Sequence, residues 1–173
     1  MASFRARRAI VHDVESLQKL CVEARGNRST LLGVRPDTLD PAAWLNALAP
    51  VVIAEEAGKP VAFAAAAPWP VPLGASRCAE LVVYVTSARR RCGAARSAFG
   101  ELISVCRVMG LWKLVAYALP EDAAARGLLG RLDFREVGVM AKHVQIEGSW
   151  RDVVMQERLV MASRRSAPSI PDA

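Results

Sequence analysis

Residues 83–103 read VYVTSARRRCGAARSAFGELI, and they combine a strand, a block of charge and a helix within a short span. The strand-like part ends near Val85, three arginines occupy positions 89–91, and the small residues at 93–95 lead into a helical pattern. A strand that turns tightly into a helix leaves backbone N–H groups unpaired at the helix start, and these groups bind anions. Small residues let a phosphate approach the backbone, and arginines donate paired hydrogen bonds to its oxygens. The stretch predicts a pyrophosphate site, and a solvated basic turn is the alternative.

Along the rest of the chain, the apolar periodicity predicts alternating strands and helices. Strands are expected at residues 4–8, 51–56, 60–67, 79–85, 111–119, 134–142 and 152–161. Helices are expected from His12-Asp13 to Ala24, and over residues 41–48, 93–109 and 121–132. Asp13 is a plausible helix cap, and Gly58-Lys59 is a plausible hairpin turn. Residues 26–36 and 68–74 look like loops. This order predicts an α/β (mixed α+β) fold, in which helices pack on a mixed sheet.

Two helices show a clear apolar face. The helix at 93–109 should bury Ala95, Phe99, Leu102, Cys106 and Met109, which recur at steps of four and three. The helix at 121–132 should bury Ala125, Leu128, Leu129 and Leu132. Both helices are therefore expected to lie on the sheet.

Composition narrows the class of protein. The chain has 173 residues, of which 53% are hydrophobic, which suits one domain with a sizeable core. We expect that domain to span residues 1–161, with a disordered tail at 162–173. No apolar stretch is long enough to cross a membrane and no signal-peptide pattern is present, so a cytoplasmic location is expected. The four cysteines lack metal-binding spacing, which predicts reduced thiols and no metal site.

The formal net charge of +6 suits an anionic partner, either nucleic acid, a membrane surface or a phosphorylated cofactor. The chain contains neither the GxxxxGK[ST] loop nor a GxGxxG fingerprint with a suitably spaced acidic residue. The candidate anion-binding site of the chain is therefore the predicted pyrophosphate site at residues 90–96.

Residues 90–95, RRCGAA, fit the (Gln/Arg)-x-x-Gly-x-(Gly/Ala) signature, and the chain resembles the GNAT superfamily of acyl-CoA N-acyltransferases. The phosphinothricin acetyltransferase family looks closest, and the resemblance covers about residues 4–161. The matching positions are Pro68-Trp69, Ala79-Glu80, Val83-Tyr84-Val85, Leu132, Phe134 with residues 135–139, Gly148, Trp150 and Asp152.

The resemblance implies a splayed sheet that binds acetyl-CoA between two parting strands, here 79–85 and 111–119. It implies that the backbone of Val83, Tyr84 and Val85 pairs with the pantetheine arm. The implied cofactor-binding residues are Val83, Tyr84, Val85, Arg90, Arg91, Cys92, Gly93, Ala94, Ala95, Arg96 and Asp122. Glu80 occupies the position of the family's glutamate, and a carboxylate in the apolar strand AELVVYV can serve as the general base. The alternative is a salt-bridged structural residue.

Several positions depart from the family pattern. Asp122 replaces an asparagine and can instead cap its helix, while Leu129 replaces a histidine. Water, or departure of the thiol as thiolate, could then replace the missing proton donor. The basic residues that would hold an acidic amino acid are absent near Ile146-Glu147, so phosphinothricin is a doubtful acceptor. Trp69 and Trp150 are the candidate acceptor-pocket residues, although either could belong to the core.

These observations predict an acetyl-CoA-dependent N-acetyltransferase that acts on a small-molecule amine or amino acid, with homodimerisation possible. The alternative is a non-catalytic acyl-CoA-binding protein. A nucleic-acid-binding module is disfavoured, because no reader motif and no aromatic residues interleaved on a basic face are present.

Overall fold

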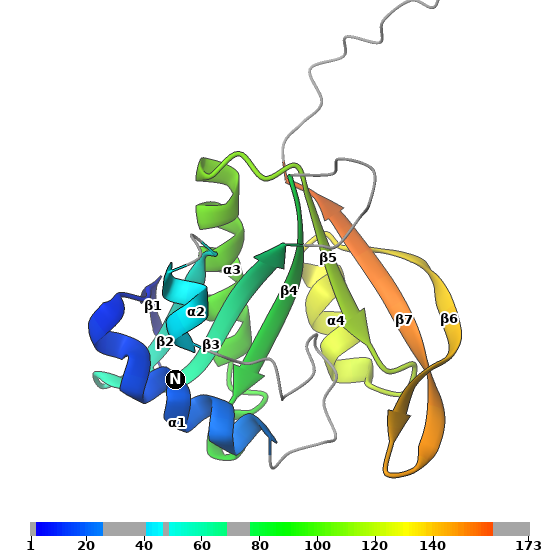
Figure 1. Cartoon of the computed structure of the whole chain (residues 1–173), viewed down its shortest axis with the longest axis horizontal. Coiled ribbons are helices and arrows are strands. Elements are labelled where there is room, and N and C mark those ends of the chain that lie inside the picture. The colour runs from blue at the N-terminus through cyan, green and yellow to red at the C-terminus, as the bar shows by residue number, and fades with distance from the viewer. Residues whose placement is uncertain (1–2, 26–40, 47–48, 69–76, 161–173) are drawn as a thin grey trace, which may run out of the picture.

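The structure, a computed structural model, describes residues 3–25, 41–46, 49–68 and 77–160. Its centre is a sheet of seven strands in the order β1-β2-β3-β4-β5-β7-β6 (Figure 1). The strands are β1 (Arg5–Arg8), β2 (Val51–Glu56), β3 (Lys59–Pro68), β4 (Cys78–Val85), β5 (Lys113–Ala118), β6 (Arg135–Ile146) and β7 (Ser149–Leu159). The helices are α1 (Val14–Arg25), α2 (Pro41–Asn46), α3 (Ala94–Val108) and α4 (Ala123–Arg131), with 3-10 helices η1 (Val11–Asp13) and η3 (Ser87–Arg89). The predicted mixed α+β fold is confirmed.

The sheet opens between its two parallel strands. Every pair of neighbouring strands is antiparallel except β4 and β5, which pair only through Cys78↔Lys113, Ala79↔Leu114 and Glu80↔Val115. Beyond these pairs the two strands diverge, as Figure 1 shows. The predicted splayed sheet is therefore confirmed, and Glu80 stands at the point where the splay begins.

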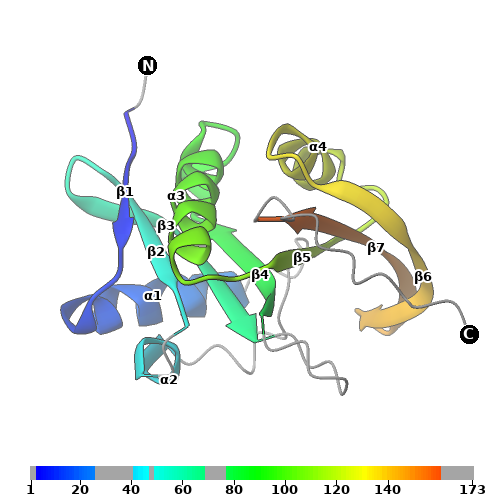
Figure 2. The same ribbon diagram turned by 90° about the horizontal axis from the view of Figure 1, so that it is seen from above.

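Helices cover both faces of the sheet. Figure 2 shows α1 and α2 on one face, and α3 and α4 on the other. The core under α1 includes Leu17, Leu20, Val82 and Tyr84. The core under α3 and α4 includes Ala79, Leu81, Phe99, Leu102, Leu114 and Leu129. Successive residues of a strand point to opposite faces, so β4 contributes alternately to the two cores.

Some sequence expectations about helices need correction. Met109 follows the last residue of α3 and is 41% exposed, because it leaves the helical path over the sheet. Ala95 is half-buried: it packs against the core and also lines a cavity. Asp13 does not cap the free N–H groups of α1: its carboxylate accepts from the preceding Ile10 N–H at 2.8 Å and from Arg7 at 2.7 and 2.8 Å. Leu132 is half-buried, since it lies beyond the end of α4.

The final hairpin is longer than the pattern predicts. Strands β6 and β7 extend to Ile146 and from Ser149, and only Glu147-Gly148 separates them, both with positive φ (50° and 78°). The outer part of this hairpin is largely exposed, so it lacks the apolar alternation that marks a strand in sequence. The loops expected at 26–36 and 69–74, the end of the second helix at 47–48, Trp69 and the tail at 162–173 lie outside the described residues.

Candidate active site

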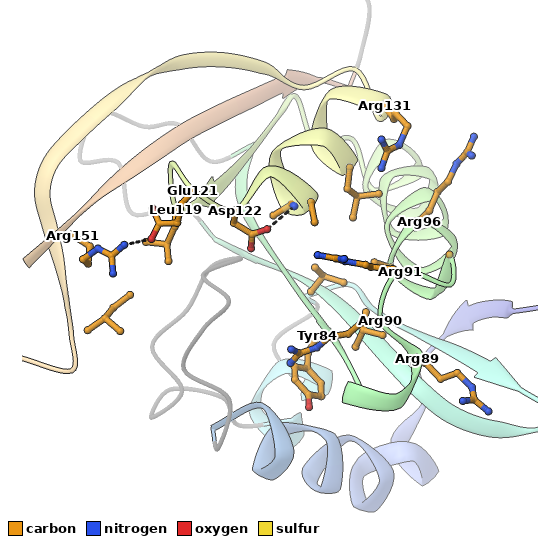
Figure 3. Close-up of a pocket in the computed structure, with 18 of the residues that line it drawn as sticks. Tyr84, Arg89, Arg90, Arg91, Arg96, Leu119, Glu121, Asp122, Arg131 and Arg151 are labelled. Carbon is orange, nitrogen blue, oxygen red and sulfur yellow. Dashed lines mark hydrogen bonds and ion pairs between the residues drawn. The ribbon is translucent and has the colours of Figure 1, made fainter. Parts of the chain in front are cut away.

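A cavity of about 1120 Å³ lies on the α3/α4 side of the sheet, where β4 and β5 have parted (Figure 3). Its lining comes from β4, from the turn into α3 and the start of that helix, from the segment before α4 and α4 itself, and from the β6–β7 hairpin. The lining residues are Val83, Tyr84, Val85, Arg89, Arg90, Arg91, Gly93, Ala95, Arg96, Leu119, Glu121, Asp122, Ala124, Ala125, Leu128, Arg131, Ile146, Glu147 and Arg151. Nine of the eleven predicted cofactor-binding residues are in this set.

The start of α3 presents free backbone donors to the cavity. Gly93 is the N-cap residue, and no side chain caps this helix end. The first helical hydrogen bond is donated by Ser97 to the Gly93 carbonyl at 3.0 Å, which leaves the N–H groups of Ala94, Ala95 and Arg96 without helical partners. Unpaired N–H groups and the positive end of the helix dipole together favour an anion.

Gly93 is required by its backbone conformation more than by space. Its φ is +101°, in the left-handed region that side chains with a Cβ adopt at a cost of about 1–2 kcal/mol. A Cβ there would meet only the ring of Phe4, at 4.0 Å. Arg91, two residues earlier, also has a positive φ of 59°. The turn into α3 therefore contains two residues in the left-handed region, as expected where the chain reverses tightly.

The arginines of the run at 89–91 are not equivalent. Arg89 forms an ion pair with Glu56 on β2, and Figure 3 shows its side chain pointing away from the cluster of Arg91, Arg96 and Arg131. Those three side chains have no ion-pair partner among the described residues. The positive charge available to a ligand therefore comes from both α3 and α4.

The backbone of β4 offers hydrogen bonds to the gap. Thr86 donates its N–H to the Val61 carbonyl of β3 at 2.9 Å, next to the pair Ala62↔Val85. Because backbone groups alternate in direction along an antiparallel pair, those of Val83 and Val85 point away from β3, toward the gap. The backbone groups of Tyr84 face β3. This narrows the predicted backbone contacts to Val83 and Val85.

The side chain of Tyr84 lies on the opposite face of the sheet from Arg91, Arg96 and Arg131. It is 7% exposed, and its hydroxyl oxygen has no hydrogen-bond partner among the described residues. Figure 3 shows the ring directed toward α1. Burial, and then the nearby Glu23 carboxylate, raise the pKa of the Tyr84 phenol well above its ordinary value. The phenol therefore stays protonated near neutral pH.

Glu80 occupies the α1 side of the splay. It pairs with Val115 on β5 and with Ala67 on β3, and it is half-buried. Its neighbours Ala79 and Leu81 point into the core under α3, so the Glu80 side chain points the other way, toward the α1 face. It does not line the cavity.

Asp122 acts as the N-cap of α4. Its Oδ1 accepts a hydrogen bond from the Ala125 N–H at 2.9 Å, while the residue also lines the cavity. The capping alternative is therefore confirmed. Leu129, at the family's histidine position, is fully buried in the core under α4. No proton donor can act from that position.

The structure does not bring every predicted residue to the cavity. The Ala94 side chain is in the core, Cys92 is exposed, and neither is in the lining. Trp150 is 60% exposed on the hairpin and also lies outside the lining. Trp69 lies outside the described residues.

Among the lining residues that were not anticipated as site residues, four are charged and follow β5: Glu121, Arg131, Glu147 and Arg151. Arg151 on β7 forms an ion pair with Glu121, which joins the hairpin to the segment before α4. These residues come from elements that follow β5, and only their packing places them opposite the turn into α3. A search for charged residues at the ends of the helix at 121–132 could have suggested Arg131, because that helix was expected to border the site.

No cysteine is among the residues that line the cavity. All four cysteines are free. Within residues 3–25, 41–46, 49–68 and 77–160, no group of histidine, cysteine, aspartate and glutamate side chains could hold a metal ion. In the same residues no helix is both long and apolar enough to span a bilayer.

The chain matches the acetyltransferase (GNAT) family over residues 17–134 and belongs to that family. The family resemblance, the fold and the class of enzyme are thereby confirmed. Comparison with curated proteins gave no match.

Solved structures share the fold over nearly the whole chain. A Salmonella typhimurium structure described with its cofactor acetyl-CoA has a TM-score of 0.82 at 23% identity, and covers 98% of this chain and 99% of that one. A ribosomal-protein-alanine N-acetyltransferase from Brucella melitensis has a TM-score of 0.77 at 27% identity, with coverage of 90% and 99%. A phosphinothricin acetyltransferase from Sinorhizobium meliloti in complex with acetyl-CoA has a TM-score of 0.76 at 19% identity, with coverage of 97% and 94%.

Proposed function

We propose that this protein is an acetyl-CoA-dependent N-acetyltransferase that acts in the cytoplasm on the amine of a small molecule or amino acid. The observation that carries the proposal is the uncapped, glycine-led start of α3, which faces the cavity at the mouth of the splay between β4 and β5. Acetyl-CoA has the matching shape, with a pyrophosphate for the helix start and a narrow arm for the gap.

Different groups of the protein would bind different parts of acetyl-CoA. The N–H groups of Ala94, Ala95 and Arg96, with the Arg91 guanidinium, would bind the pyrophosphate. The backbone groups of Val83 and Val85 would pair with the amides of the pantetheine arm as an added strand would. Asp122 can only accept hydrogen bonds, so we assign it an N–H or O–H of the arm, never a phosphate oxygen.

Glu80 would act as the general base. An amine is mostly ammonium at neutral pH and must lose a proton before its lone pair attacks the thioester carbonyl. The pantetheine arm, inserted from the α3 side, would bring the thioester through the splay toward the face on which Glu80 lies. A strand N–H near Val83 would bind the oxyanion. Collapse then releases the thiolate, which takes its proton from water, and the acetyl group stays on nitrogen.

The sequence of the β6–β7 hairpin argues against an acidic acceptor. Where the phosphinothricin acetyltransferases that the chain resembles carry basic residues, the hairpin tip here contributes Ile146 and Glu147 to the lining. Arg151, the basic residue that lines the cavity from the hairpin, is already paired with Glu121. A free carboxylate on the acceptor would find no unpaired positive partner among the described hairpin residues in the lining. We therefore favour a neutral or cationic amine over phosphinothricin.

The competing function is a non-catalytic acyl-CoA-binding protein, which Leu129 in place of a histidine favours. Two measurements separate the candidates. Acetyl-CoA at a hundredfold its dissociation constant should stabilise the fold by about 2.7 kcal/mol. Release of free thiol from acetyl-CoA across a panel of amines then reports transfer. Absence of a melting shift at millimolar acetyl-CoA contradicts both candidates. A shift without thiol release from any amine favours the binding protein.

A further inference from the structure

We propose that the side chains of Arg96 and Arg131 form a second anion subsite, which binds the 3′-phosphate of the CoA donor. It is separate from the pyrophosphate cradle, by which we mean the backbone N–H groups of residues 94–96 and the Arg91 guanidinium. The enzyme would thereby select acetyl-CoA over 3′-dephospho-acetyl-CoA. This inference rests on the proposed function, and it concerns how the donor is recognised.

Arg96 and Arg131 approach the cavity from two different helices. Arg96 is the third residue of α3 and Arg131 is the last residue of α4, and both line the cavity. Figure 3 shows their side chains on the same side of the cavity, away from Glu121 and Arg151. The two helices lie on the same face of the sheet, so each side chain can reach a ligand that lies between them.

The Arg131 side chain is directed toward the cavity by the helix itself. Its Nη1 atom lies 3.5 Å from the position that a Cβ on Gly127 would occupy. The side chain therefore runs back along α4 by one turn, toward the end of the helix that lines the cavity. Gly127, which has no side chain, leaves the surface of that turn open to the guanidinium.

Neither guanidinium has an ion-pair partner among the described residues, whereas Arg126 and Arg135 nearby do. Two unpaired positive charges that line one cavity repel each other. A bound anion removes that repulsion and accepts hydrogen bonds from both forks. The lining thus contains more unpaired positive charge than a pyrophosphate held by backbone N–H groups requires.

The chemistry of the donor identifies the anion. Each pyrophosphate group carries one negative charge, whereas a phosphate monoester carries about 1.5 to 2 near neutral pH. The 3′-phosphate is the monoester of acetyl-CoA, and it lies on the ribose beyond the pyrophosphate. The two arginines lie beside the pyrophosphate cradle and outside the β4–β5 gap. They therefore suit the 3′-phosphate better than they suit the pantetheine arm.

The test compares two donors by calorimetry. Wild-type protein, Arg96→Gln and Arg131→Gln are each titrated with acetyl-CoA and with 3′-dephospho-acetyl-CoA. Arg107→Gln is the matched control, because Arg107 lies on α3, is exposed, and does not line the cavity. Both site arginines are also exposed, so melting temperatures should stay close to that of the wild type.

We expect the wild type to bind acetyl-CoA about tenfold more tightly than the dephospho donor. Each site variant should weaken acetyl-CoA binding about three- to tenfold and leave dephospho-donor binding unchanged, as for loss of one charged contact. Arg107→Gln should change neither. Equal weakening of both donors, or no weakening, would overturn the subsite while acetyl-CoA binding stands. Failure of wild-type protein to bind either donor would overturn the proposed function together with the subsite.

Discussion

The Asp122 carboxylate accepts a hydrogen bond from the Ala125 N–H at 2.9 Å and at the same time faces the cavity. One oxygen is used to close the first turn of α4, and the residue places negative charge next to a cavity rich in arginine. Asp122 therefore caps α4, and its negative charge opposes the binding of an anionic ligand in the cavity.

This relationship predicts the behaviour of Asp122→Asn. Asparagine caps helices about as well as aspartate, so the free energy of unfolding should hardly change, whereas Asp122→Ala should cost about 1 kcal/mol. Removing the negative charge should tighten acetyl-CoA binding about threefold, the scale of one partly screened charge interaction. Titration and chemical denaturation measure both effects. Weaker binding in Asp122→Asn would show that the hydrogen bond from the arm to the carboxylate outweighs its repulsion of the phosphates.

Gly93→Asp should weaken acetyl-CoA binding at least about tenfold, because it places a carboxylate beside the N–H groups that hold the pyrophosphate. The left-handed backbone of Gly93 should also cost the variant about 1–2 kcal/mol of folding free energy. Gly93→Ala is the matched control, since it carries the same strain without charge and should lose less affinity. Unchanged affinity in Gly93→Asp would place the cradle elsewhere.

Arg89 and Arg91 should differ although they are two residues apart. Arg89 is held by Glu56, so Arg89→Gln should alter acetyl-CoA affinity by less than about twofold. Arg91 lines the cavity and has no ion pair within the described parts of the chain, so Arg91→Gln should weaken binding about three- to tenfold. The ratio of the two dissociation constants is the measurement. Equal effects would mean that the basic run acts only through its total charge.

Glu80→Gln should separate binding from chemistry. Glutamine keeps the size of the side chain but cannot accept the amine proton near neutral pH, so turnover should fall about 10²- to 10⁴-fold at nearly constant acetyl-CoA affinity. The loss should shrink as pH rises, because more of the amine is already neutral. Steady-state rates across a pH series provide the measurement.

The structural alternative for Glu80 makes a different prediction. A salt-bridged carboxylate whose role is stability would give a lower melting temperature and a modest activity loss that does not depend on pH. A stable Glu80→Gln variant with near wild-type turnover at pH 7 would exclude Glu80 as the base.

Glu157 should make stability depend on pH. It is 5% exposed, its Oε2 lies 2.7 Å from the Lys113 Nζ, and it also pairs with Arg135. The Lys113 hydrogen bond, opposed by burial and assisted by Arg135, lowers the pKa of Glu157 below its ordinary 4.5. A lowered folded-state pKa stabilises the protein above about pH 4.5, and that stability is lost as the pH falls through the folded value.

Glu157→Gln should therefore cost about 1–3 kcal/mol at pH 7, the scale of a hydrogen bond to a charged group. The difference from wild type should narrow as the pH falls below 4.5, because the unfolded state then binds a proton at this carboxylate while the folded pKa lies lower. Denaturation midpoints at pH 7 and pH 3.5 give the comparison. Lys19→Gln, which removes an exposed pair with Glu15, is the control and should have little effect at either pH. A difference from wild type that is the same at both pH values would contradict the ionic role.

The sequence by itself determined the local chemistry of the site. The small residues after the arginine run predicted free N–H groups at the start of α3, and the apolar stretch AELVVYV predicted the strand that carries Glu80. The hairpin extension was missed, because an exposed strand carries no apolar alternation. The periodicity of apolar residues indicates which face of a helix or strand is buried. Predictions from it were therefore right for elements that have one face against a core.

Only the tertiary structure decided which groups meet across the cavity. Arg131 lines the same cavity as Arg96 because α3 and α4 pack on one face of the sheet. The charge of Arg89, which also lines the cavity, is neutralised by its ion pair with Glu56 on β2. The gap itself arises because β4 and β5 stop pairing after Glu80↔Val115. Such contacts join residues far apart in the chain, and they depend on how whole elements pack, which local residue patterns do not encode.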